Sequence, residues 1–291
     1  MSDSGFAAPP PPPLPPNAGG PAGVGGGDAI PQRGLDDILS AAFAIYRANA
    51  GKLIVIVAVV VIPLSFISHF LTGVVFAATK TTVQGPLGSY TTVAPRSFAT
   101  VIAVWLTGLL ITIIISAIMQ AALMRGAALA TLGEAVDVEA SYKWGLGKLG
   151  SVILISILVC IMVGIGFILL IIPGVFLLTR FFVAIPALVV ENHQGAEAIS
   201  RSWNLTKGHF WHVLGTIVVA GLITGVVGGI IGAFAGSSWF LGWVFGSIAQ
   251  ILVAPFSALV SIVLYLDLCA RTEGLTATKL RTALKEASPS S

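Results

Sequence analysis

Six long apolar runs dominate this chain and leave little freedom in how it folds. A helix needs about 20 apolar residues to cross the roughly 30 Å hydrocarbon layer of a bilayer. The runs are Leu53–Ala78, Phe98–Met124, Ser151–Ile172, Gly174–Val190, Phe210–Ala235 and Trp239–Leu268. Only 9% of the residues are charged, whereas a soluble globular chain carries about 25%. The sequence therefore predicts an all-α integral membrane protein with six transmembrane helices.

The segments outside these runs divide the chain into three predicted parts. Residues 1–34 hold nine of the sixteen prolines and eight glycines, a composition that predicts a disordered tail. Residues 35–270 form the predicted membrane domain, and residues 271–291 form a predicted cytoplasmic tail. The proline-rich run PPPPPLPP in the first tail is a candidate docking segment for a protein partner, although a solvated tether is the plainer interpretation.

The basic residues are distributed unequally between the two sides of this helical array. With the N-terminus in the cytoplasm, twelve lysines and arginines fall on the cytoplasmic side and only Lys80 and Arg96 fall outside. Cytoplasmic loops of membrane proteins carry an excess of basic residues. The sequence therefore predicts a multi-pass protein of the plasma membrane, with both termini in the cytoplasm.

A short pattern recurs ahead of the first, third and fifth runs. The segments YRANAGKL (46–53), YKWGLGKL (142–149) and WNLTKGHF (203–210) each place an aromatic residue five positions before a glycine, which a basic residue follows. An amphipathic helix at the lipid headgroups, ended by glycine, gives this pattern. Interfacial junctions also collect aromatic and basic residues without any repeat. The predicted architecture is three transmembrane hairpins, each preceded by an interfacial helix.

The fourth run contains a charge that does not fit its surroundings. Arg180 lies about six residues beyond Pro173 and Gly174, which predict a tight hairpin turn at the membrane surface. Small residues share its helical face, and small residues line contacts between transmembrane helices. We therefore expect Arg180 to point into the bundle as the hub of a structural polar layer, with ligand binding as the alternative. Its expected partners are His69, Thr72, Thr107 and Ser247.

The segment GFILLIIPGVFLLTRFFVAIPALVVE, followed by AISRSWNLTKG, resembles the membrane domain attached to some bacterial glycerophosphoryl diester phosphodiesterases. The resemblance is strong over residues 166–210 and extends over 35–270, and it implies a bacterial membrane protein. The phosphodiesterase reaction belongs to a separate barrel of about 250 residues. This sequence has no such segment, so the resemblance does not imply that activity. The matching positions are Ile172, Pro173, Gly174, Arg180, Pro186, Ala187, Glu191, Ala198, Arg201, Ser202, Trp203, Lys207 and Gly208.

Few polar groups lie where catalysis would need them. The predicted outer loop, 79–97, contains no Asp, Glu, His or Cys, and therefore no general base or metal ligand. His209 and His212 share a helical face and could bind a metal, but packing at the interface is the plainer interpretation. We predict no catalytic, cofactor or metal site. The candidate structural or ligand positions are Arg180, His69, Pro173, Gly174, Glu191, Arg201 and Trp203.

The function that best fits this sequence is that of a non-enzymatic membrane protein that organises lipids or partner proteins. A transporter or channel subunit is the alternative, although the near absence of ionisable residues at mid-membrane counts against it. A lipid-modifying enzyme at the inner face ranks last. The expected partners are the lipid bilayer, a protein at the N-terminal tail and a second copy at Gly221, Gly225 and Gly229, with no nucleic acid. For those glycines, packing within the chain's own bundle is the default.

Overall fold

The computed structural model describes residues 32–76, 79–85, 88–94, 98–234, 239–274, 276, 278, 279 and 282. The side chains of residues 68–101, 103–105, 107, 109–112, 114 and 239 are outside this description. The predicted N-terminal tail, apart from its last three residues, and most of the C-terminal tail therefore lie outside the described residues.

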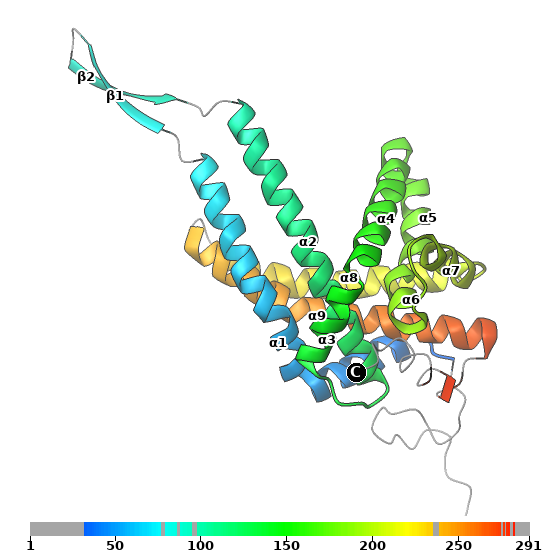
Figure 1. Ribbon diagram of the computed structural model, residues 1–291. Coiled ribbons are helices and arrows are strands. Elements are labelled where there is room, and N and C mark those ends of the chain that lie inside the picture. The colour runs from blue at the N-terminus through cyan, green and yellow to red at the C-terminus, as the bar shows by residue number, and fades with distance from the viewer. Residues whose placement is uncertain are drawn as a thin grey trace, which may run out of the picture.

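Helices make up most of the described chain (Figure 1). They are α1 (Leu35–Phe76), α2 (Phe98–Thr131), α3 (Val138–Gly147), α4 (Leu149–Leu169), α5 (Ile171–Phe181), α6 (Ala184–Glu191), α7 (Ala196–Thr206), α8 (Phe210–Ala233) and α9 (Trp239–Glu273). Five described segments are long and apolar enough to cross a membrane: Leu35–Ile67, Leu149–Leu169, Ile171–Glu191, Phe210–Ala233 and Phe240–Glu273. A shorter apolar helix, Ile115–Thr131, belongs to α2. The prediction of a helical, membrane-embedded protein is confirmed.

The segment predicted as the outer loop is not irregular. Strands β1 (Thr79–Gly85) and β2 (Gly88–Ala94) pair antiparallel, with Thr79 opposite Ala94. This two-stranded hairpin projects away from the helices at the far ends of α1 and α2 (Figure 1). Threonine and valine recur in both strands, and β-branched residues favour extended backbone. The all-α prediction is therefore wrong for this segment.

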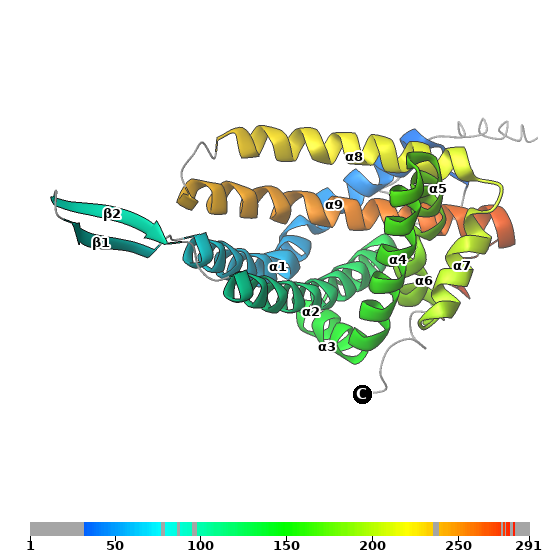
Figure 2. The same ribbon diagram turned by 90° about the horizontal axis from the view of Figure 1, so that it is seen from above.

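Three helical hairpins make up the body of the fold. The α1–α2 and α4–α5 pairs rise from the same side of the α8–α9 pair and diverge from each other (Figure 1). Seen from above, α8 and α9 lie side by side over most of their lengths (Figure 2). The short helix α3 lies beside the C-terminal half of α2, and the short helix α7 lies beside the C-terminal end of α5.

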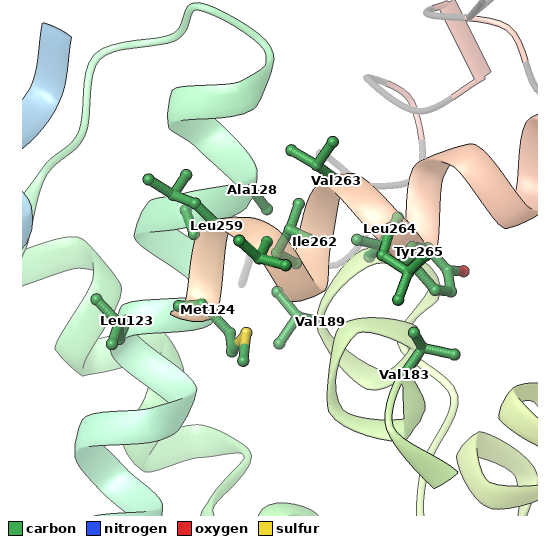
Figure 3. Close-up of a cluster of buried hydrophobic side chains, with 14 of the residues drawn as sticks. Leu123, Met124, Ala128, Val183, Val189, Leu259, Ile262, Val263, Leu264 and Tyr265 are labelled. Atoms are coloured by element: carbon green, nitrogen blue, oxygen red, sulfur yellow. The ribbon is translucent and has the colours of Figure 1, made fainter. Parts of the chain in front are cut away.

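The C-terminal half of α9 forms the centre of the core. Every residue from Ala258 to Ala270 is buried. A helix that is apolar on nearly every side lies either in a protein core or in a bilayer, and this part of α9 is covered by the other helices. In Figure 3, α9 side chains such as Leu259, Ile262 and Tyr265 lie between those of α2 and those of the α5–α6 region. The core is therefore built around one helix rather than between equal layers.

The first predicted interfacial helix does not end at its glycine. Gly51 lies inside α1, which continues without interruption from Leu35 to Phe76. Buried residues recur at helical spacing on both sides of Gly51, from Ile38 and Ala42 to Leu53 and Ile56. One continuous buried stripe favours one continuous helix, and α1 bends rather than breaks (Figures 1 and 2).

The other two copies of the repeated pattern do separate two helices. The second short helix, α3, ends at Gly147, and the backbone N–H of Lys148 donates to the carbonyl oxygens of Trp144 and Gly145 before α4 begins. The third, α7, ends at Thr206, and Gly208 has a φ of 87°, a backbone conformation that favours glycine. The predicted break at glycine is therefore right for the second and third copies and wrong for the first.

The turn between α4 and α5 lies three residues before its predicted place. Leu170 has extended backbone and separates the two helices, while Pro173 and Gly174 lie in the first turn of α5. Proline is tolerated there because the first N–H groups of a helix have no intrahelical acceptor. Gly174 instead serves the contact between the helices: a Cβ atom on Gly166 would lie 2.9 Å from the Cα atom of Gly174.

Gly166→Ala should therefore destabilise the protein, because the added methyl group meets backbone atoms that can move only if the hairpin opens. Overpacking of this kind costs about 1–3 kcal/mol in the free energy of unfolding. Gly164→Ala is the matched control, since a Cβ atom there meets nothing within 4 Å. Thermal unfolding in detergent measures both. Equal melting temperatures for the two variants would show that the close approach at Gly166 is not required.

Candidate functional site

The predicted fourth span is interrupted near its middle. Helix α5 ends at Phe181, and α6 begins at Ala184. Pro186 explains the interruption, because proline has no N–H to donate to the carbonyl group four residues earlier, and its ring clashes with that group. A proline in this place predicts a kink; in the structure two residues, Phe182 and Val183, interrupt the helix.

The break leaves a backbone carbonyl group that α7 satisfies. The hydroxyl group of Ser202 donates to the carbonyl oxygen of Arg180 at 2.7 Å, and that of Thr206 donates to the same oxygen at 3.4 Å. Both donors are buried. The amphipathic helix α7 therefore packs directly against the broken end of α5.

The Arg180 side chain lies between two aromatic rings. Its guanidinium carbon is 4.9 Å from the centre of the Phe176 ring and 5.1 Å from that of Trp203. The Nε and Nη1 atoms are buried and have no hydrogen-bond partner among the described residues. Cation–π attraction stabilises the charge but does not replace an acceptor for each N–H group. We call Phe176, Arg180, Ser202, Trp203 and Thr206 the break site.

The predicted polar layer around Arg180 has a different composition in the structure. Ser247 forms a hydrogen bond with Ser65 at 2.8 Å and donates to the Trp243 carbonyl oxygen, and so does not belong to the break site. The side chains of His69, Thr72 and Thr107 lie outside the described residues. The prediction of Ser247 as a partner is wrong. That prediction placed Arg180 level with the C-terminal half of α1 and the start of α9, where Ser65 and Ser247 meet. Arg180 instead lies beside α7.

An ion-pair network joins α6, α7 and α9 beside the break site. The Nε and Nη2 atoms of Arg201 donate to the two carboxylate oxygens of Glu191 at 2.7 and 2.6 Å, and Nη2 also donates to Glu273 at 2.7 Å. Tyr265 donates its hydroxyl group to Glu191, and His193 lies 2.9 Å from the same carboxylate. The hydrogen bonds to Glu273 and then to Glu191 raise the pKa of Arg201. We call these five residues the Arg201 network.

A second network is centred on Asp267, whose side chain has no exposed surface. Its carboxylate accepts from Arg271 Nε at 2.7 Å and from the backbone N–H of Arg33 at 2.6 Å. His212 Nε2 lies 2.9 Å away. Sequence reasoning missed this network, although an acidic residue four positions before an arginine on one helix was a signal for it. His212, which was considered with His209 as a possible metal ligand, is instead in contact with the Asp267 carboxylate.

Metal binding finds no support in this region. Among the described residues, no group of three or more His, Cys, Asp or Glu side chains is arranged to hold a metal ion. Of the sequence-predicted positions, the structure brings Glu191 and Arg201 into direct contact and stacks Trp203 on Arg180. Pro173 and Gly174 lie in the α4–α5 hairpin instead.

Comparison with known families gives one match. The family model of a domain of unknown function (DUF7847) matches residues 38–268. The chain belongs to this family. No curated protein and no solved structure matches it.

The DUF7847 domain also contains an apolar groove of about 800 Å³ between α2, α4, α5 and the middle of α9. Leu178 and Phe181 of α5 and Phe182, which directly follows α5, lie close to Arg180 in the sequence and line one wall of it. The polar lining residues are Ser116, Gln120, Ser156, Gln250, Ser257 and Ser261. The hydroxyl oxygen of Ser156 is buried and has no hydrogen-bond partner among the described residues.

The small-residue row of α8 faces away from the rest of the DUF7847 domain. A Cβ atom added at Gly221, Gly225 or Gly229 would meet nothing within 4 Å. Packing of these glycines within the chain's own bundle was the default interpretation, and it is wrong. They lie on the exposed side of α8 because the α9-facing side carries the buried Val213, Thr216 and Ala220.

Proposed function

We propose that this protein is a non-enzymatic integral membrane protein that binds and organises anionic lipids, through the break site and the groove beside it. The observation that carries the proposal is the Arg180 guanidinium group, which has two buried N–H-bearing nitrogens without acceptors among the described residues. A buried donor without an acceptor is costly. A lipid phosphate group supplies both the negative charge and the oxygen acceptors that this side chain lacks.

The surroundings of Arg180 support a headgroup rather than a soluble anion. Trp203 is 37% exposed, and tryptophan is enriched at the membrane–water boundary. Lys207, one residue beyond α7, is also exposed. The same turn of α5 lines the apolar groove, so a lipid bound at Arg180 can place an acyl chain along that wall.

We further propose that the chain enters a bacterial plasma membrane as six helical segments in three hairpins, with both termini in the cytoplasm. Twelve of fifteen basic residues then lie on the cytoplasmic side, where anionic lipid headgroups attract them. The predicted kinship with phosphodiesterase membrane domains remains a proposal, and the N-terminal tail as a docking segment for a protein partner remains another.

Lipid selectivity tests this function. Phosphatidylglycerol added to the detergent-purified protein should stabilise it by about 2.7 kcal/mol at a hundredfold excess over the Kd, and phosphatidylcholine should stabilise it less. In Arg180→Gln, the difference between the two lipids should disappear. The measurement is the melting temperature at increasing lipid concentration.

Arg47→Gln is the matched control, because Arg47 is exposed on α1 and the substitution removes the same charge. It should retain the selectivity of the unaltered protein. If both variants lose selectivity equally, the preference comes from total charge and not from the break site. If Arg180→Gln keeps the preference, the proposal fails.

A transporter or channel subunit is the second candidate, and the interrupted α5–α6 segment favours it. Secondary transporters form their sites with broken helices of this kind. In proteoliposomes, flux of a small solute that depends on this protein would support the second candidate over the first.

A further inference from the structure

The tip of the α4–α5 hairpin exposes five consecutive large aliphatic side chains. Their exposed fractions are 86% for Ile168, 69% for Leu169, 68% for Leu170, 73% for Ile171 and 81% for Ile172. No polar, charged, tryptophan or tyrosine residue interrupts the tip. A turn at the membrane–water boundary normally carries such residues, so this tip is unsuited to that position.

The other hairpin on this side ends in two strands with the composition that a water-exposed end requires. The α1–α2 pair ends in strands β1 and β2, whose sequences TKTTVQG and GSYTTVA are mostly polar. Both tips belong to the same chain, and both hairpins rise from the same side of the α8–α9 pair (Figure 1). The contrast indicates that the two tips lie in different solvents.

Contacts between α7 and the hairpin give the depth of the tip. Helix α7 marks the headgroup level, because its Glu197 side chain is 76% exposed and Asn204 is exposed as well. The C-terminal part of α7 touches α5 at Arg180, and Leu170 lies ten residues further, about 15 Å along the helix. The N-terminal end of α7 is in contact with α4 at Leu154, where a Cβ atom on Gly195 would lie 3.2 Å from the Leu154 side chain. From there the tip is sixteen residues away, or about 24 Å.

Both distances are shorter than the roughly 30 Å thickness of the hydrocarbon layer. A hairpin that begins at the headgroups therefore ends before the opposite boundary. In an apolar solvent each backbone polar group needs a partner, and part of this need is met at the tip. The N–H of Leu170 donates to the Gly166 carbonyl oxygen at 3.0 Å, and Pro173 removes one donor from the first turn of α5.

We propose that the α4–α5 hairpin is re-entrant: it enters the bilayer, turns at Leu170 within the hydrocarbon, and returns to the side from which it came. Its exposed aliphatic tip contacts lipid acyl chains. The hairpin then contributes no segment that crosses the membrane, and the proposed location of both termini on one side is unchanged. This inference rests on membrane embedding and not on the lipid selectivity of Arg180.

Depth measurement by electron paramagnetic resonance tests the proposal. A nitroxide label is placed on Leu170→Cys, in a full-length protein that carries Cys160→Ser and Cys269→Ala, reconstituted in phosphatidylglycerol and phosphatidylethanolamine vesicles. Collision rates with oxygen, which concentrates in hydrocarbon, and with a water-soluble nickel complex are compared. Ser89→Cys on the polar β-hairpin and Glu197→Cys on α7 are the control positions. Leu170 tolerates the label because its side chain is 68% exposed.

The oxygen-to-nickel collision ratio should be highest at position 170, lower at 197 and lowest at 89. A ratio at 170 that matches the ratio at 89 would place the tip in water and overturn the proposal. Exclusion of both reagents at 170 would show that protein covers the tip, and would also overturn it. Neither result depends on which lipid Arg180 prefers, so the two proposals fail separately.

Discussion

Asp267→Ala should lower the free energy of unfolding by about 3–5 kcal/mol, the typical cost of removing one partner from a buried ion pair. The Asp267 carboxylate has no exposed surface, and it holds Arg271, His212 and the backbone N–H of Arg33 together. Without it, the segment before α1 loses one of its two hydrogen bonds to α9, and Arg271, which donates the other to the Arg33 carbonyl oxygen, loses its carboxylate. Chemical unfolding in detergent micelles measures the difference.

Glu139→Ala provides the control for this prediction. Glu139 pairs with Lys143 at 2.7 Å, but both side chains are more than 70% exposed. Exposed pairs of this spacing contribute about 0.3–0.5 kcal/mol. If Asp267→Ala costs no more than Glu139→Ala, water reaches the Asp267 network, and the network does not anchor α1.

The second large effect is expected at the Arg201 network. Arg201→Gln should destabilise the protein by about 3 kcal/mol, since it leaves Glu191 and Glu273 without the cation between them. Arg201→Lys should recover part of this loss only, because an ammonium group cannot form the paired hydrogen bonds of a guanidinium group.

A double-mutant cycle with Glu191→Gln separates this interaction from other effects of each substitution. The coupling energy between Glu191 and Arg201 should fall in the upper part of the 0.5–3 kcal/mol range observed for residues in contact. Unfolding of the two single variants, the double variant and the unaltered protein supplies it. A coupling energy near zero would mean that the pair forms without stabilising the contact between α6 and α7.

The sequence predicted the helices well because each depends on a local property. An apolar run of sufficient length requires a helix in a membrane whatever surrounds it. The predicted third run began at Ser151, and α4 begins at Leu149. The turn at Leu170 was missed because a Pro-Gly pair is a strong turn signal, while the use of Pro173 in the first turn of a helix and of Gly174 in a close contact depends on where the neighbouring helix lies.

The candidate site was predictable only in part. Glu191, Arg201 and Trp203 were identified through the resemblance, and all three prove to contact each other or Arg180. Their partners were not identified, because Glu273 is separated from Arg201 by 72 residues along the chain. No periodicity or local spacing indicates a contact over that distance. The interruption at Phe182 and Val183 was not predictable for the same reason. It frees the Arg180 carbonyl oxygen, which needs the hydroxyl donors of α7, and the position of α7 is not a local property of the sequence.

The central position of α9 has a consequence for how the protein is assembled. In the described chain, every helix that packs around α9 precedes it in the order of synthesis, so the earlier hairpins enter the membrane before the helix that fills their common interior exists. Their α9-facing surfaces must meanwhile be solvated by lipid, which is as apolar as the side chains that later replace it. Insertion and compaction are therefore separate events in time, and a ribosome that stalls before residue 258 leaves inserted hairpins that have only their direct contacts with one another, without the helix that fills the space between them.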